Sequence, residues 1–333
     1  MNAMRRLSYA AFFVACSHLV FGAIVRITGS GMGCGDHWPK CLGEWFPPMN
    51  RPDLIIEISH RWLAAFLIVS MLSVFGLAFS RRATPGVGGP GGVLRSATLA
   101  VVLVISAALL GAVTVKLGNP PLATLGHWTI AMSLVATAAV SVMRAGGFGA
   151  STARMASVSA KTRRASFAAA ALALVTVVMG GLTAKFPGAA VACQSFPLCG
   201  ANPQVEAAAV HVQGTHRVLA VLLVLHLIGV FFAVRKRGES PIIRRAAAIA
   251  LSLGVLQLLV AGAMIGMHLP PVLRSLHEAI GVSIWVATFV FAYLAQVGGT
   301  TERAGPSVAS DLRFNSPTLP HSVAVIIARG ADA

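Results

Sequence analysis

The chain has 333 residues, of which 56% are hydrophobic and only 11% carry a charge. A soluble globular domain has roughly 25% charged residues, so this composition excludes an ordinary soluble enzyme, and it is too apolar for a disordered chain. The formal net charge of +16 would suggest nucleic-acid binding in a soluble protein. Here the charges lie between long apolar runs, so they are better explained by orientation in a membrane, and no nucleic-acid partner is expected.

Eight apolar segments are long enough to cross a membrane, which takes about 20 apolar residues. They are approximately Leu7–Val25, Ser59–Phe79, Ala97–Val115, Leu122–Val142, Phe167–Ala184, Gly214–Val234, Ala246–Met267 and Ser275–Ala295. A cleaved signal peptide after Arg5 and Arg6 is an alternative for the first segment, but its apolar run is long for that role. The sequence therefore predicts an all-α membrane protein with eight transmembrane helices.

Basic residues are divided unequally between the two sides of the predicted membrane protein. Of the 26 Lys and Arg residues, 18 fall on the side that holds both termini and 8 on the other side. Because cytoplasmic loops carry the excess of basic residues, both termini are predicted to be cytoplasmic, in a bacterial inner membrane. Two long loops, about 26–58 and 185–213, then lie on the outer side.

The two halves of the chain resemble each other. In the same order, each half contains two cysteines, a His-Arg pair, and a Pro-Pro pair followed by a histidine. These are Cys34, Cys41, His60-Arg61, Pro120-Pro121 and His127 in the first half, and Cys193, Cys199, His216-Arg217, Pro270-Pro271 and His277 in the second. Such order in both halves indicates an internal repeat rather than chance similarity of apolar sequence.

The repeat predicts how the chain is organised. Each half has four spans, so both halves enter the membrane in the same direction, as two four-helix bundles related by a pseudo-two-fold axis along the membrane normal. The predicted parts are an N-terminal half at 1–143, a C-terminal half at 167–297 and a flexible cytoplasmic tail at 298–333. A basic segment at 144–166, rich in Ser, Ala and Gly, is interpreted as a cytoplasmic linker.

Four of the ten histidines belong to the repeat, namely His60, His127, His216 and His277. Each lies near the start of a span that runs inward, so all four are expected inside the bundle and toward the outer face. One imidazole from each of two helices suits the two axial positions of a haem iron, whereas tetrahedral zinc needs more ligands at one point. A hydrogen-bonded interfacial residue is the alternative for any single one. The sequence has no Cys-x-x-Cys-His, which excludes c-type attachment.

Two other histidines lie within predicted spans but have no matched partner in the other half. His18 and His226 are therefore interpreted as residues that hydrogen-bond one helix to another. The remaining histidines receive no predicted role.

A different polar residue precedes the matched histidine in each half. Glu57 lies three residues before His60, and Gln213 lies three residues before His216. Residues three apart share a helix face. Glu57 is therefore predicted to point toward whatever His60 binds, as a proton donor or acceptor or as a stabiliser of positive charge. A solvated carboxylate at a helix start is the alternative.

Arg61 and Arg217 directly follow the matched histidines. A guanidinium at this place is a candidate partner for a haem propionate. An ordinary interfacial arginine is the alternative.

The cysteines form two close pairs in the predicted outer loops. Cys34 and Cys41 have six residues between them, and Cys193 and Cys199 have five. The outer side of a bacterial membrane permits disulfides, so two short-loop disulfides are the simplest interpretation, each adding about 2–3 kcal/mol of stability. A redox role for the first pair is the alternative. Cys16, within the first span, is interpreted as a buried apolar residue.

Taken together, these motifs resemble the haem A synthase family. The matching segments are Arg26-Ile27-Thr28-Gly29-Ser30-Gly31 with Cys34 and Cys41, then Glu57-Ile58-Ser59-His60-Arg61, Gly126-His127-Trp128, Thr215-His216-Arg217 and Leu276-His277. The resemblance extends from Arg5 to about Ala295. It implies an enzyme that oxidises a methyl group of haem O to the formyl group of haem A by successive hydroxylations.

The resemblance also implies two haem sites. Substrate haem O would occupy a site made by Glu57, His60 and His127, while His216 and His277 would hold a haem b cofactor. Haem O synthase and cytochrome oxidase assembly factors are candidate partners, besides membrane lipid, and a homo-oligomer is one alternative for the assembly. The competing hypotheses are a di-haem electron carrier, which would not need Glu57, and a haem transporter or chaperone without turnover.

Overall fold

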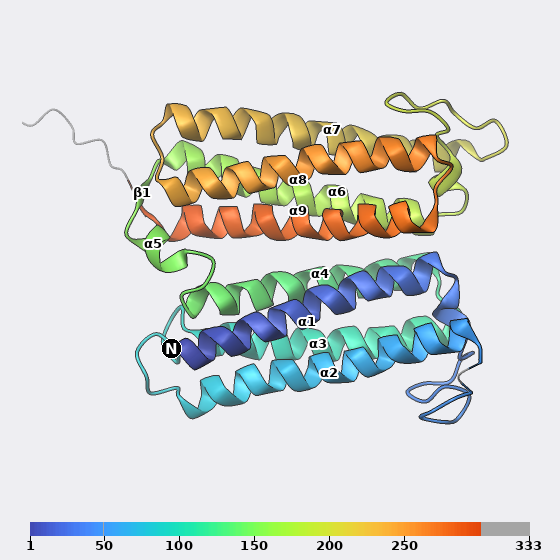
Figure 1. Cartoon of the computed structure of the whole chain (residues 1–333), viewed down its shortest axis with the longest axis horizontal. Helices are drawn as coiled ribbons and strands as arrows, with labels where there is room; N and C mark the ends of the chain where they lie inside the picture. The colour runs from blue at the N-terminus through green and yellow to red at the C-terminus, as the bar shows by residue number, and fades with distance from the viewer. Residues whose placement is uncertain (49, 301–333) are drawn as a thin grey trace, which may run out of the picture. The chain divides into compact units, whose positions relative to one another are not determined.

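The structure is a computed structural model that describes residues 1–48 and 50–300, all within one compact unit. Eight long helices account for most of it (Figure 1): α1 Asn2–Ile27, α2 Pro52–Ser80, α3 Val93–Lys116, α4 Pro121–Arg144, α6 Ala160–Lys185, α7 Ala207–Lys236, α8 Pro241–Gly266 and α9 Pro271–Val297. The short elements are η1 Ser30–Met32, α5 Ala150–Arg154, β1 Ser157–Val158, η2 Ala189–Val191 and β2 Gly299–Thr300. Of the predicted tail, residues 301–333 lie outside the described residues.

All eight predicted spans coincide with helices that are long and apolar enough to cross a membrane. The helices begin earlier or end later than the apolar segments, because their polar end turns continue beyond the hydrocarbon core. The prediction of an all-α protein with eight transmembrane helices is confirmed, and the chain is a multi-pass membrane protein.

The distribution of side chains over the helices also fits a lipid environment. Large apolar side chains such as Phe66, Leu109 and Leu259 point outward and are more than half exposed, whereas alanines such as Ala169 and Ala250 are fully buried between helices. Small residues let helix backbones approach closely in lipid. Apolar residues therefore face both outward and inward, as expected when the surrounding solvent is hydrocarbon.

Proline starts the fourth helix of each half. Pro121 is the first residue of α4 and Pro271 the first residue of α9, where the missing N–H costs no hydrogen bond. The turns before them are alike as well, because Asn119 and Leu269 both have positive φ, 58° and 63°. The matched Pro-Pro pairs thus mark the same kind of tight turn into a helix.

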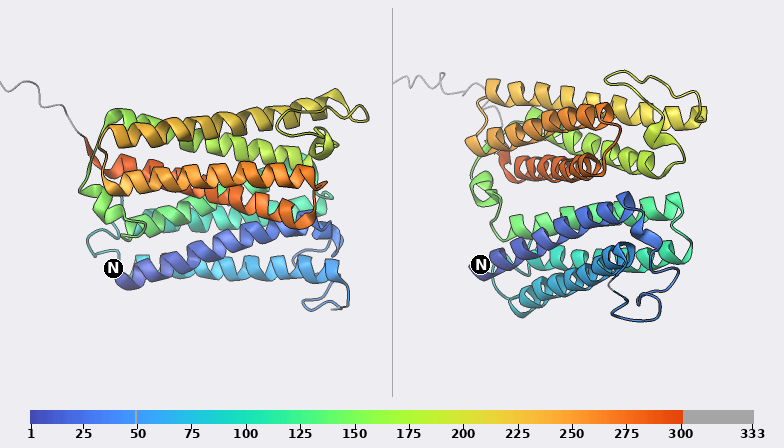
Figure 2. Two further views of the ribbon diagram at one scale, coloured as in Figure 1. Left: turned by 45° about the horizontal axis from the view of Figure 1, so that its top comes forward. Right: turned by 45° about the vertical axis from the view of Figure 1, so that its right-hand side comes forward.

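The helices contact one another in two groups of four. Helix α1 contacts α2 and α4, and α3 contacts the same two helices; likewise α6 contacts α7 and α9, and α8 contacts those two. The groups meet through α1, α4, α6 and α9 (Figures 1 and 2). At this junction Trp285 Nε1 of α9 donates to the Met132 carbonyl of α4 at 3.1 Å. Residues 28–48 and residues 186–206 belong to long loops at the same end of the helices, here termed the long-loop end.

The predicted linker at 144–166 is largely folded. It contains α5, β1 and the first turns of α6, and β1 pairs in parallel with β2, with Ser157 opposite Gly299. The Ser159 hydroxyl caps α6 by accepting from Thr162 N, and it donates to Glu239 Oε1 at 2.6 Å. These contacts give the segment more order than its Ser-, Ala- and Gly-rich composition indicates.

Candidate functional site

The four matched histidines all lie in the first turns of their helices from the long-loop end. His60 follows the start of α2, and His127 follows the start of α4. His216 and His277 occupy corresponding places in α7 and α9. In each half, the repeat thus brings one histidine from the second helix and one from the fourth to the same end of the bundle.

His60 and His127 line one cavity of about 630 Å³ in the first group of helices. Its wall is mainly apolar, with Leu67, Val104 and Leu134 among its lining residues, and Glu57 lies in the same wall. Sites for cofactor-sized ligands are typically clefts of about 300–1,000 Å³, mostly apolar with a few polar groups. The cavity therefore has the size and lining of a site for a large, mainly apolar ligand.

Two of the histidines are oriented by backbone carbonyls. His127 Nδ1 is 2.8 Å from the Ala107 carbonyl of α3, and His216 Nδ1 is 3.0 Å from the Thr176 carbonyl of α6. A carbonyl can only accept, so Nδ1 carries the proton and Nε2 keeps its lone pair. This second contact is the one that metal-binding histidines commonly make. Both side chains fit the role of an axial ligand.

His60 is fixed differently, by stacking on another histidine. The His18 ring of α1 lies parallel to the His60 ring, with 4.3 Å between the centroids. His60 Nδ1 and His18 Nε2 are buried and have no hydrogen-bond partner among the described residues. A buried polar atom without a partner is costly. Two such atoms beside the cavity therefore fit a site that a polar or metal-bearing ligand completes.

His277 lies against a glutamine rather than a carbonyl. Gln257 Nε2 of α8 donates to the His277 carbonyl at 2.9 Å and lies 3.3 Å from His277 Nε2. Gln257 Oε1 and His277 Nδ1 are buried without partners among the described residues. If His277 Nε2 were to hold an iron, the Gln257 amide nitrogen that now lies 3.3 Å from it would have to move away.

The unmatched histidines differ from each other. His226 Nε2 of α7 is 2.9 Å from the Ala165 carbonyl of α6, so the predicted helix-to-helix hydrogen bond is confirmed. The same prediction was wrong for His18, which lines the cavity and stacks on His60. In the second half, the residue of α6 at the corresponding place is Thr176, whose carbonyl lies 3.0 Å from His216 Nδ1.

Glycines make room for three of the histidine rings. A Cβ atom added at Gly22 or Gly111 would lie 3.2 or 3.1 Å from Cε1 of His60 or His127, respectively. At Gly180 it would lie only 2.9 Å from Cε1 of His216. Real Cβ contacts are rarely that short, so Gly180 sets the place of the His216 ring.

We expect Gly180→Ala to displace the His216 ring and to weaken or alter any spectroscopic signal of a metal bound there. Gly229→Ala on α7 is the matched control, because nothing lies within 4 Å of its added Cβ. That control should behave as the wild type or gain slightly in helix stability, by about 1 kcal/mol. The optical spectra of purified variants measure the difference, and equal spectra for both variants would contradict this role of Gly180.

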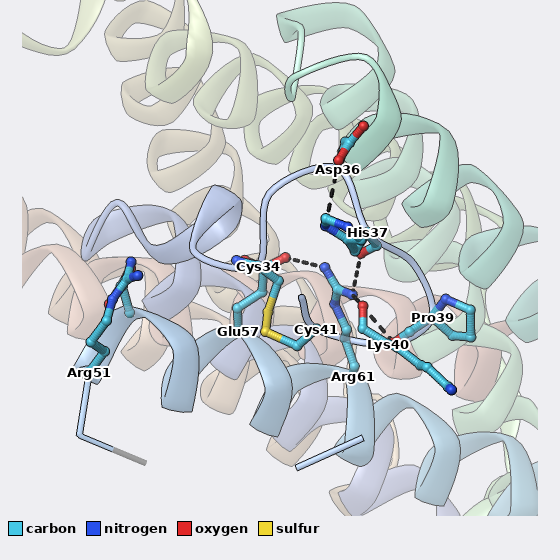
Figure 3. Close-up of a disulfide and its surroundings, with 10 residues drawn as sticks. Cys34, Asp36, His37, Pro39, Lys40, Cys41, Arg51, Glu57 and Arg61 are labelled. Carbon is cyan, nitrogen blue, oxygen red and sulfur yellow. Dashed lines mark hydrogen bonds and ion pairs between the residues drawn. A yellow bond between two sulfur atoms is a disulfide. The ribbon is translucent and has the colours of Figure 1, made fainter. Parts of the chain in front are cut away.

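Glu57 connects α2 to the disulfide loop of the first half (Figure 3). The Cys34–Cys41 disulfide is present, as the sequence predicted, and Glu57 Oε2 accepts from the Cys34 backbone N–H at 2.8 Å. Glu57 Oε1 accepts from Arg61 Nη2 at 2.5 Å, and both side chains are nearly buried. Glu57 is thus a buried, paired carboxylate in the cavity wall, and the alternative of a solvated carboxylate is wrong.

Arg61 of α2 binds backbone carbonyls of the same loop. Its Nη1 donates to the His37 carbonyl at 2.6 Å and to the Lys40 carbonyl at 2.7 Å (Figure 3). Together with the Glu57 ion pair, these bonds occupy both terminal nitrogens of the guanidinium. Most of the N–H groups of Arg61 therefore bind the loop and Glu57, and a contact of Arg61 with a haem propionate stays a prediction.

The second half has the corresponding contacts between helix and disulfide loop, with an uncharged amide in place of the carboxylate. The Cys193–Cys199 disulfide is present as predicted, and Gln213 Oε1 accepts from the Cys193 N–H at 2.5 Å. Arg217 donates to the loop carbonyls of Ser195 at 2.6 Å and Cys193 at 3.1 Å. In both halves, a side chain of the second helix accepts from the N–H of the first loop cysteine. That side chain is a carboxylate, Glu57, in the first half and an uncharged amide, Gln213, in the second.

Four polar side chains line the cavity that were not predicted to do so: His18, Arg26, Lys185 and Glu278. His18 has no counterpart in the repeat, and Lys185 and Glu278 come from α6 and α9, outside the first half. Glu278 pairs with Arg26 across the junction of the two helix groups. The only sequence signal was Arg26 itself, which opens the motif Arg26–Gly31.

The fold and the site define a multi-pass helical membrane protein with a histidine-lined cavity near one end of its helices. The chain matches the family model COX15-CtaA, described as cytochrome oxidase assembly protein, over residues 5–55 and 52–289. The chain belongs to this family.

Curated relatives support the assignment. The chain is 31% identical over 301 residues to a protein of Geobacillus kaustophilus (strain HTA426) named Heme A synthase, covering 88% of this chain and 90% of the relative. It is 28% identical over 304 residues to one of the same name from Bacillus cereus (strain AH187), covering 88% and 92%. A third, from Shouchella clausii (strain KSM-K16), is 32% identical over 217 residues, covering 64% and 70%.

Proposed function

We propose that this protein is a membrane oxidoreductase that converts haem O to haem A. The observation that carries the proposal is the 630 Å³ cavity whose wall combines two histidines with a buried carboxylate. The family membership, and relatives named Heme A synthase, support the same activity. The reaction oxidises one methyl group of the porphyrin to a formyl group by successive hydroxylations. The methyl carbon loses two hydrogen atoms and gains one oxygen atom, and an external oxidant is the co-reactant that takes up the electrons.

In this proposal, the two halves bind different haems. Residues 1–143 form the substrate half, and residues 167–297 form the half that holds a haem b cofactor through His216 and His277. Residues 144–166 connect them on the cytoplasmic side. The excess of basic residues on that side supports an inner-membrane orientation with both termini in the cytoplasm.

In the substrate half, His60 and His127 are the side chains available to the iron of haem O. His127 presents Nε2 because its Nδ1 is held by the Ala107 carbonyl. His60 is held in place by the His18 ring and by the space beside Gly22. Iron-porphyrin chemistry supplies the oxidising power, while the protein supplies position, axial ligands and an apolar enclosure.

Glu57 is the residue that this proposal assigns to the chemistry. Its carboxylate is buried in the cavity wall of the substrate half only, where it can hold a proton or stabilise positive charge that develops on the oxidised carbon. Arg61 orients the carboxylate by donating to one of its oxygens, and the Cys34 N–H donates to the other. Gln213, at the equivalent place, has no charge to contribute.

The direct test is turnover of haem O by the purified full chain in membranes, followed by acid extraction and chromatography of the pigment. Haem A or its hydroxylated intermediate should accumulate with time. A protein that binds two haems and exchanges electrons with them reversibly, yet leaves haem O unchanged, would instead be a di-haem electron carrier.

A further inference from the structure

Charged side chains of the cavity lie in two groups. Glu57 and Arg61 form one group and satisfy each other together with the disulfide loop. Arg26, Lys185 and Glu278 form the other, contributed by three helices that meet at the junction of the two halves. The second group is not used by the reaction proposed above.

Arg26 is held at the cavity by the turn that follows it. The Thr28 hydroxyl donates to the Ile24 carbonyl at 2.8 Å, and Gly29 takes a positive φ of 71°, which a residue without Cβ adopts freely. The carbonyl of Gly31 accepts from Asn119 Nδ2 at 2.7 Å, which ties the turn to the start of α4. The motif Arg26–Gly31 thus builds part of the cavity wall and fixes the last turn of α1.

The present partner of Arg26 is exchangeable. Arg26 Nη2 donates to Glu278 Oε2, and both side chains remain partly exposed, 22% and 18%. A partly solvated ion pair contributes little net stability, so a second carboxylate can compete for the guanidinium. Lys185 lines the same cavity and forms no ion pair within the described part of the chain.

We propose that Arg26 and Lys185 bind the two propionates of haem O, in place of Arg61. The proposal rests on the function proposed above. Two cations at one end of the cavity match two carboxylates on one edge of a porphyrin, and arginine binds a carboxylate through two parallel hydrogen bonds. The propionates would then face the junction of the halves, and the apolar edge of the ring would face Leu67, Val104 and Leu134.

Such binding also links the two sites. The residue that releases Arg26 is Glu278, which directly follows His277 in α9. The substrate propionates would therefore replace a contact that the cofactor half now makes.

The test is to titrate the purified holoprotein with haem O, and separately with the dimethyl ester of haem O, in the absence of a reductant. Binding is measured by the change in Soret absorbance. The wild type should bind the diacid more tightly than the diester. Arg26→Gln and Lys185→Gln should each weaken diacid binding by about tenfold to a hundredfold, the range for hydrogen bonds to charged groups, and leave diester binding unchanged. Lys116→Gln is the matched control, because Lys116 is exposed at the same end, on α3, and does not line the cavity.

The outcomes separate this proposal from the one on function. Equal binding of diacid and diester by the wild type, or an equal loss of both in the variants, would overturn the role of Arg26 and Lys185 while haem O binding itself stands. No binding of either form would instead contradict the proposed function. Arg26→Gln removes the ion pair to Glu278 that joins the two halves, so this variant can also be less stable. Lys185→Gln removes no ion pair of the described residues, so its diacid and diester affinities test the proposal independently of stability.

Discussion

Replacing Glu57 with Gln should lower the rate of haem O oxidation by about a hundredfold or more, with the fold and haem binding intact. Proton transfer by a positioned side chain contributes roughly 10²–10⁴-fold, and removing a charge that stabilises the transition state costs a similar factor. The measurement is single-turnover conversion of bound haem O, with haem content determined in the same samples.

Gln is the informative substitution because the chain already contains it at the equivalent place. Gln213 accepts from the Cys193 N–H as Glu57 accepts from the Cys34 N–H. The variant can therefore keep the bond to the Cys34 N–H and lose the charge together with the ion pair to Arg61, whereas Glu57→Ala would also release the loop. Glu44→Gln, an exposed change in the same loop, is the control and should retain wild-type rates. A Glu57→Gln protein with more than half of the wild-type rate would exclude Glu57 from the chemistry.

If the second half holds the proposed haem b, replacing His216 with Ala should remove it, whereas replacing His127 with Ala should leave it bound and abolish conversion of haem O. The reason is that each residue presents Nε2 in a different half, with Nδ1 held by a carbonyl. Without His216, the iron would keep His277 as its one proposed ligand, and the haem would be held less tightly. Haem per protein and the reduced optical spectrum measure both effects.

His211→Gln is the control for this comparison. His211 lies on the same helix as His216, but it is exposed and its Nδ1 contacts the Ala207 carbonyl of its own helix. Haem content should match the wild type. If His216→Ala retained its haem with an unchanged spectrum, the assignment of the cofactor to the second half would be wrong.

The fold could be predicted well from the sequence because a membrane imposes one dominant pattern. A span has to be helical and apolar over a fixed length, so composition alone located all eight helices. The ends were less accurate: α7 begins at Ala207, whereas the apolar run begins near Gly214, because its first turns carry His211 and Gln213 outside the apolar stretch. The secondary structure within 144–166 was not predicted. It depends on contacts with residues distant in the sequence, namely Ser159 with Glu239 and Ser157 with Gly299.

The site could be predicted only where the repeat marked it. Duplication selected His60, His127, His216 and His277, but it also discounted His18, which has no duplicate and yet stacks on His60. The bonds of Arg61 to loop carbonyls were not predicted, because they depend on how residues 34–41 fold back over α2, and its contact with a propionate stays a prediction. Lys185 and Glu278 could not be found from either half alone, because they reach the cavity from the other half.

The most direct test of the account is a cryo-electron microscopy map of the full chain in lipid nanodiscs with haem O added and no electron donor. The account predicts a porphyrin in the 630 Å³ cavity, with His60 and His127 on opposite faces of its iron and a second haem between His216 and His277. A porphyrin bound elsewhere, or an iron in that cavity that neither His60 nor His127 reaches, would contradict it.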